Sequence, residues 1–326
     1  MNENVIKLSV INMTKLYDNG DGVKNVNIDV HEGELVTLLG PSGCGKTTIL
    51  RTIGGFNDLT EGDITIDGQS IITLPPEKRP TSMVFQSYNL WPHMTVHDNL
   101  EFGLKLKKIP KAEREERIAH SLELVKMTGF EKKYPNQMSG GQQQRIAIAR
   151  SLLLEPQVLL LDEPFSALDA KIRLQMREEL RKIQTDLNIT VVFVTHDQEE
   201  AMMLSDRIIV MSKGHIEQQG SPLDIYYHPA TKFVASFIGE MNFIETADGK
   251  QTAVRPEDIT VSKDGKGDIE GTVRTIMMLG HYNEMTMQTE KGLVKAYLSS
   301  DEARKFERGD LVQLSFGRKD EFENVD

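Results

Sequence analysis

Eight consecutive residues, from Gly40 to Thr47, have the types and spacing of a phosphate-binding loop, G-x-x-x-x-G-K-[ST]. Glycines let backbone N–H groups wrap around phosphates, and the start of a following helix adds a positive dipole. Lys46 can neutralise phosphate charge, and the Thr47 hydroxyl can bind Mg²⁺. A glycine-rich turn of purely structural use is the alternative, which the full match between a predicted strand and a predicted helix disfavours. The candidate residues for binding ATP or GTP are Gly40, Pro41, Ser42, Gly43, Cys44, Gly45, Lys46, Thr47 and Thr48.

Two carboxylates follow a second apolar run. Residues 158–161 read Val-Leu-Leu-Leu, and Asp162 and Glu163 come directly after them. Ligands of α/β proteins bind at the carboxyl ends of such strands. Asp162 is therefore predicted to help hold Mg²⁺, and Glu163 to act as the general base on an attacking water. The alternative is a strand end closed by polar residues without a catalytic role.

The elements that must position these residues form an α/β pattern. Short apolar runs alternate with helix-like stretches up to about residue 239, and they predict one buried, mostly parallel sheet. From Ser87 to Pro156 helical pattern dominates, which predicts a helical insertion at about 87–157. Beyond Met241, short strands separated by Gly- and Asp-containing turns predict a small β domain. The expected domains are 1–239 and 240–326, and the expected strands are 36–39, 82–85, 158–161, 190–195 and 207–211.

Composition limits the classes of function. A chain of 326 residues suggests two domains, and a net charge of -11 with a pI near 5.3 makes nucleic acid an unlikely partner. The single cysteine, Cys44, fits a reducing compartment. The first ten residues lack the features of a secretory signal, and apolar runs are far below the roughly 20 residues that span a bilayer. Work at a membrane would therefore require a partner chain.

The segment from Met138 to Arg145, Met-Ser-Gly-Gly-Gln-Gln-Gln-Arg, resembles the LSGGQ signature of ABC (ATP-binding cassette) ATPases, with Met138 in place of the first leucine. Ser139 and two glycines open a predicted helix and offer its free amides to an anion; by itself the segment could be an ordinary helix cap. Other positions of the family follow in order. Gln86 looks like the Q-loop glutamine that reaches Mg²⁺ and the attacking water, and residues 166–169 look like the D-loop. His196 looks like the switch histidine that contacts the γ-phosphate.

The resemblance implies a P-loop NTPase cassette whose cofactors are ATP and Mg²⁺, with Thr47, Gln86 and Asp162 around the metal. Tyr17 stands where the family places an aromatic ring on adenine; a plain core tyrosine is the other interpretation. In this family two nucleotides lie between two cassettes. Ser139, Gly141 and Gln142 of one chain would therefore contact the nucleotide of the other, which implies a homodimer or a heterodimer with a similar chain.

The carboxyl-terminal part resembles importer cassettes. Residues 220–239 resemble their tail, and residues 254–259, Val-Arg-Pro-Glu-Asp-Ile, resemble the entry to a TOBE domain, a small β-barrel-like (TOBE/OB) appendage. An unrelated β domain is the alternative. The resemblance implies an ATP-hydrolysing importer subunit on the cytoplasmic face of the cell membrane, bound to permease subunits and served indirectly by an external solute-binding protein.

Three other functions are weighed against the importer. A soluble ABC ATPase of repair or translation usually carries paired cassettes or coiled-coil insertions, and an exporter cassette is commonly fused to membrane spans. A regulatory module without turnover would not need Glu163 and His196. The solute stays open among polyamines, ferric iron, phosphonates, sugar phosphates, sugars and other small solutes, because the cassette barely contacts the cargo.

Overall fold

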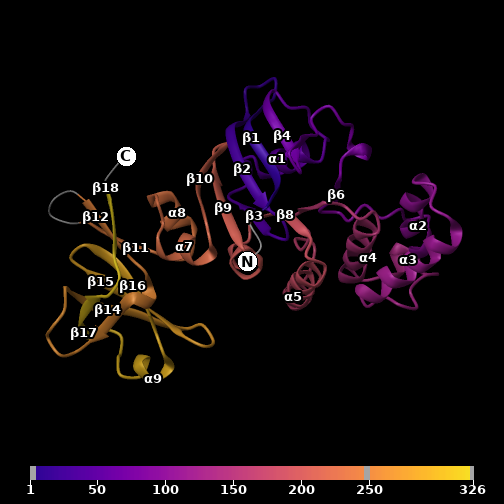
Figure 1. Ribbon diagram of the computed structural model, residues 1–326. Coiled ribbons are helices and arrows are strands. Elements are labelled where there is room, and N and C mark those ends of the chain that lie inside the picture. Colours follow the sequence, from indigo (N-terminus) through magenta and orange to yellow (C-terminus); the bar gives the residue numbers. More distant parts are fainter. Residues whose placement is uncertain (1–4, 246–249, 324–326) are drawn as a thin grey trace. The chain divides into compact units, whose positions relative to one another are not determined.

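The computed structural model describes residues 5–245 and 250–323, and the chain divides into two compact units, 1–222 and 223–326 (Figure 1). Each unit has its own hydrophobic core. The first unit carries the predicted phosphate loop and both predicted carboxylates.

The central sheet of the first unit is mostly parallel. Five neighbouring strands run parallel, and β10 pairs antiparallel at one edge. β3, β7 and β8 are buried along their whole length because other elements cover both faces. The α/β fold with a mostly parallel sheet is thereby confirmed. In spatial order the strands are β10 (His215–Gly220), β9 (Arg207–Ser212), β3 (Leu35–Leu39), β8 (Thr190–Thr195), β7 (Val158–Asp162) and β6 (Thr81–Val84).

A second, antiparallel sheet has two strands before the phosphate loop and two after it in the chain, and it was not expected from the sequence. Its strands are β2 (Gly22–His31), β1 (Ile6–Leu16), β4 (Glu61–Ile66) and β5 (Gln69–Ser70), in that order. Inward residues such as Leu8, Val10 and Val30 share one core with Ile49 of α1 and Val192 of β8. This sheet therefore covers one side of the phosphate-binding helix.

Helices surround the central sheet. α1 (Lys46–Ile53) follows β3, and α5 (Ala170–Leu187) and α6 (Gln198–Leu204) follow β7 and β8. Between β6 and β7 the described chain is helical, which confirms the expected helical insertion. It contains α2 (Val96–Leu106), α3 (Lys111–Leu124) and α4 (Gly140–Leu152), which pack around apolar residues including Leu100, Leu122 and Ile146. Short 3₁₀ turns occupy Pro76–Lys78 and Pro135–Gln137.

The second unit is built mainly from antiparallel strands. One sheet has the order β11 (Asn242–Glu245), β12 (Lys250–Val254), β18 (Asp320–Glu323). The other has the order β13 (Ile259–Ser262), β17 (Leu311–Phe316), β14 (Ile269–Met278), β15 (Asn283–Thr289), β16 (Gly292–Leu298). The remaining elements are α7 (Pro222–Tyr227), α8 (Lys232–Phe237), the 3₁₀ turn Pro256–Asp258 and α9 (Ser300–Ala303).

The second compact unit begins at residue 223, whereas 239 was the expected end of the first domain, and one buried arginine connects α7 and the segment after α8 to the β strands. The Arg255 side chain donates hydrogen bonds to the carbonyl oxygens of Tyr226 (2.8 Å), Glu240 (3.1 Å) and Ile238. Its guanidinium carbon lies 3.9 Å from the centre of the Tyr226 ring. α7 and the segment after α8 are thus fixed to the second unit.

Candidate active site

The phosphate loop joins the end of β3 to the start of α1, and its glycines are needed for its shape. Gly43 and Gly45 have φ values of 82° and 105°, which residues with a side chain rarely adopt. A Cβ atom on Gly45 would lie 2.2 Å from Val23 Cγ1, and one on Gly40 would lie 2.4 Å from the Met211 carbonyl oxygen. The loop therefore keeps its backbone bare where it passes close to β2 and β9.

Lys46 places its charge at this loop. Its Nζ donates hydrogen bonds to the carbonyl oxygens of Gly40 (2.6 Å) and Pro41 (2.9 Å), and the residue is 5% exposed. Cys44 is buried beside it, with Sγ 3.8 Å from Nζ. The loop's own carbonyl oxygens thus hold a cation beside its backbone N–H groups, which suits a phosphate chain.

Thr47 and Asp162 meet where the metal was expected. The Thr47 hydroxyl donates to Asp162 Oδ1 at 3.0 Å, and Arg51 Nη2 lies 3.8 Å from Asp162 Oδ2. Burial raises the pKa of Asp162, while the Thr47 hydrogen bond and the Arg51 charge oppose that shift. Hydroxyl and carboxylate oxygens are the hard ligands that Mg²⁺ prefers, so the residues fit this ion.

Glu163 and His196 form a pair at the ends of neighbouring parallel strands. His196 Nδ1 lies 3.2 Å from Glu163 Oε2, and the two side chains are 57% and 22% exposed. Glu163 has a φ of 45°, and its N–H donates to the Val194 carbonyl oxygen. The chain thus turns sharply after β7 and presents the carboxylate to solvent beside Asp162.

Gln86 lies on the other side of Asp162. Both residues, with Arg51 and Ser166, line a cleft of about 440 Å³. The structure therefore brings Gln86, Thr47 and Asp162 to one region, as the metal site required.

Tyr17 lies beside α1. Its hydroxyl is 3.3 Å from Thr48 Oγ1 and also accepts a hydrogen bond from Asn57 at 3.3 Å, and the residue is 44% exposed. A tyrosine with an accessible ring next to the phosphate loop is not a core residue, which disfavours that alternative.

The signature residues lie elsewhere in the first unit. Ser139 caps α4: its hydroxyl accepts from the Gln142 N–H, and the Gln142 side chain accepts from the Ser139 N–H. A Cβ atom on Gly141 would lie 2.8 Å from Ile172 Cγ2, so a glycine is needed for α4 to approach α5. α4 packs on α2, α3, β6 and α5, whereas α1 packs on β2, β7 and β8 (Figure 1). The signature residues are therefore set apart from the phosphate loop of the same chain.

Two further groups support the site and were not singled out from the sequence. Arg51 places a positive charge beside Asp162. Buried Glu200 binds Thr195, the residue before His196. Glu200 Oε2 accepts from the Thr195 hydroxyl at 2.7 Å, and Oε1 lies 3.1 Å from Arg177 Nη2. The spacing of Asp197 and Glu200 after a strand is a helix-start signal that could have indicated this segment.

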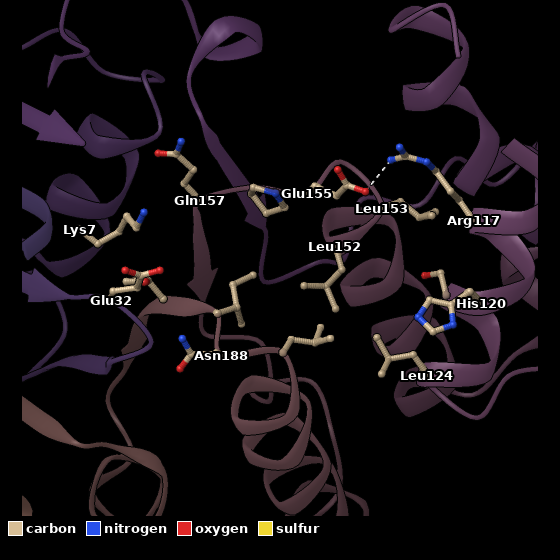
Figure 2. A pocket seen from close by; sticks show the side chains of 15 residues that line it. Lys7, Glu32, Arg117, His120, Leu124, Leu152, Leu153, Glu155, Gln157 and Asn188 are labelled. Atoms are coloured by element: carbon tan, nitrogen blue, oxygen red, sulfur yellow. Dashed lines mark hydrogen bonds and ion pairs between the residues drawn. The ribbon is translucent and has the colours of Figure 1, made fainter. Parts of the chain in front are cut away.

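A different cavity lies at the amino ends of strands β7 and β8 of the central sheet. Figure 2 shows it lined by Gln157 and Asn188, which precede β7 and β8, and by Leu124 and Leu152 of the helical insertion. No candidate active-site residue lines it. The candidate residues Asp162, Glu163 and His196 lie instead at the carboxyl ends of β7 and β8.

Comparison with known proteins agrees with this geometry. Residues 23–166 match the ABC transporter family, and residues 252–322 match the TOBE domain family. A spermidine/putrescine import ATP-binding protein, PotA, of Mesorhizobium japonicum is 46% identical over 95% of both chains. The PotA protein of Bacillus thuringiensis is 44% identical over 97% of this chain and 98% of its own.

The chain belongs to the ABC transporter family.

Solved structures of ABC cassettes resemble the chain as well. The ATP-binding cassette MJ0796, in a dimeric post-hydrolysis state with ADP and Pi, is 36% identical with a TM-score of 0.59, covering 66% of this chain and 98% of its own. Clostridium perfringens cbiO1, part of the ABC transporter complex cbiONQ, is 29% identical with a TM-score of 0.63, covering 68% of this chain and 90% of its own.

These findings confirm the ABC ATPase fold, the carboxyl-terminal TOBE domain and the ATPase subunit of an ABC importer. Nothing in them favours the soluble ABC ATPase. In the part of the chain that the structure describes, no helix is long and apolar enough to cross a bilayer.

Proposed function

We propose that this ABC ATPase drives import of a polyamine such as spermidine or putrescine through separate permease subunits, on the cytoplasmic face of the cell membrane. The proposal on the cargo is supported by the import proteins named above, whose similarity includes the TOBE domain. A solute-binding protein outside the cell would deliver the polyamine.

The hydrolytic step is assigned to residues of the described site. Glu163 accepts a proton from the attacking water, and His196 orients the carboxylate from 3.2 Å. Because a carboxylate only accepts hydrogen bonds, His196 donates to Glu163 through its Nδ1–H. The Glu163–His196 contact, next to the Thr47–Asp162 pair, is the observation that carries this assignment.

Mg²⁺ and ATP are assigned to the same residues. Thr47, Asp162 and Gln86 would hold Mg²⁺, which supplies charge neutralisation to the β- and γ-phosphates when bound. The loop from Gly40 to Thr48 would hold the phosphates, and Tyr17 would stack on adenine.

Two chains are proposed to share two nucleotides. The separation of α4 from α1 supports this, because Ser139, Gly141 and Gln142 need a second cassette to reach a nucleotide. The dimeric arrangement of MJ0796 is a precedent in a relative.

Uptake measurements test the cargo. Cells lacking this chain should lose uptake of radiolabelled spermidine or putrescine, and the intact chain should restore it while Glu163→Gln should not. Unchanged polyamine uptake after deletion, with loss of phosphonate or ferric iron uptake instead, would contradict the proposed cargo.

A further inference from the structure

The segment that carries Gln86 has an unfavourable backbone conformation. Tyr88 and Asn89 have φ values of 60° and 48°, in the left-handed region. Asparagine tolerates this region, but a bulky residue such as tyrosine rarely adopts it. Tyr88 is also 5% exposed, and its hydroxyl has no hydrogen-bond partner among the described residues. Something outside the segment must stabilise this conformation.

Arg150, near the end of α4, supplies the external contacts. Its Nη2 donates to the Tyr88 carbonyl oxygen at 3.0 Å, and its Nη1 donates to the Asn89 carbonyl oxygen at 2.8 Å. Both residues in the left-handed region are thus held by one planar guanidinium. A fork with two parallel donors fixes orientation as well as distance.

The same guanidinium contacts Trp91. Its central carbon lies 4.8 Å from the centre of the indole ring, within the range of a cation–π contact. Asn99 holds the Trp91 backbone from both sides: Oδ1 accepts from the Trp91 N–H at 2.9 Å, and Nδ2 donates to its carbonyl oxygen at 3.1 Å. Arg150 therefore bridges two anchored parts of one loop.

Charge pairing does not explain an arginine at this position. No carboxylate pairs with Arg150 among the described residues, and burial lowers the pKa of its guanidinium. A partly buried charge without a counter-ion is unfavourable compared with an apolar side chain that fills the same space. An apolar residue could not donate the two hydrogen bonds that Arg150 makes to the carbonyl oxygens of residues 88 and 89.

We infer that Arg150 is a positioning residue, which holds the loop so that Gln86 reaches the cleft with Asp162 and which links the environment of Trp91 to Gln86. The inference rests on the proposed role of Gln86 in hydrolysis. Arg150 need not touch nucleotide, so its loss should act on turnover rather than on binding.

A double-mutant cycle on ATP hydrolysis by the full chain tests the inference. Arg150→Gln should lower kcat on the order of tenfold, with the affinity for a fluorescent ATP analogue within about twofold, because a displaced Gln86 acts after binding. In a Gln86→Ala background the same substitution should change kcat less than about twofold. Arg150→Lys keeps the charge but loses the two parallel donors, so its kcat should lie between those of the intact chain and Arg150→Gln.

Arg117→Gln is the matched control, since Arg117 lies in the same helical insertion and pairs with Glu113 and Glu155 away from the loop. It should leave kcat unchanged. If Arg150→Gln does not fold, as judged by circular dichroism, Arg150→Lys completes the cycle. Equal losses of kcat in both backgrounds would overturn the inference and leave the role of Gln86 intact. A Gln86→Ala variant with normal kcat would instead refute the role of Gln86.

Fluorescence of Trp91 tests the same inference without measuring ATP hydrolysis. Because it is the single tryptophan of the chain, its emission reports the contact directly. Mg-ATP should shift the emission of the intact chain, and Arg150→Gln should abolish that shift while nucleotide still binds. An identical ATP-induced shift in the variant, or no shift in the intact chain, would contradict the link between Trp91 and Gln86.

Discussion

Replacing Arg255 with alanine should weaken the second unit selectively. Arg255 is 4% exposed and donates to three carbonyl oxygens, of Tyr226, Ile238 and Glu240. A hydrogen bond from a charged donor contributes about 1.5–3 kcal/mol. Three such bonds would sum to about 4.5–9 kcal/mol, but carbonyls freed near the surface regain water and the buried charge is removed. We therefore expect a net loss of about 3 kcal/mol in the free energy of unfolding of this unit.

Urea unfolding followed by two probes measures this loss. With a slope of about 2 kcal/mol/M, the midpoint of the second unit should fall by about 1.5 M. Far-UV circular dichroism reports both units, whereas emission of Trp91 reports the first unit, so the two transitions can be separated. Arg318→Ala is the control, because Arg318 also contacts a tyrosine, Tyr227, but is exposed. Equal shifts for the two variants, or none for Arg255→Ala, would refute the reasoning.

Substitutions at three other positions test the nucleotide site and the contact with permease subunits. Lys46→Ala should abolish binding of a fluorescent ATP analogue, because the phosphate counter-charge acts before any chemistry; full binding would exclude the role of Lys46. Tyr17→Ala should raise the KM for ATP several-fold, while Tyr17→Phe keeps the ring and should not; equal KM values would exclude stacking. Residues 88–96 follow Gln86 as an apolar and aromatic stretch interrupted by Pro92, and the family resemblance implies that this stretch docks the membrane subunits. Trp91→Ala should therefore weaken binding of permease subunits, measured by pull-down, by about 2 kcal/mol, with ATP binding by the isolated chain unchanged. Normal assembly and transport would remove residues 88–96 as the docking segment.

The sequence predicted the phosphate loop and the buried strands because their chemistry is local. Gly40 to Thr47 form one continuous loop, and Val158 to Leu161 form a short apolar run with few other interpretations. Glu163 and His196 could be assigned separately through the family resemblance. Their contact could not be predicted, because it depends on β7 and β8 being neighbours in the sheet.

Other features depend on long-range packing. Leu8 and Val10, and likewise Val26, Ile28 and Val30, alternate with polar residues as in a half-buried strand. This signal does not show that the strands form a separate antiparallel sheet, so the sheet was not predicted. The hydrogen bonds that connect α7 and the segment after α8 to Arg255 join residues far apart in the chain, which sequence patterns do not bring together. The Arg150 contact joins residues about 60 positions apart and carries no local signature.

Hydrolysis by Glu163→Gln tests the central claim most directly. This variant should bind ATP with normal affinity, accumulate an ATP-bound dimer on size-exclusion chromatography, and release phosphate at least about a hundredfold more slowly, because it lacks the general base. Glu123→Gln, an exposed glutamate on α3, should hydrolyse ATP normally. Phosphate release by Glu163→Gln close to that of the intact chain would contradict the assignment of Glu163 as the base and of this site as the centre of hydrolysis.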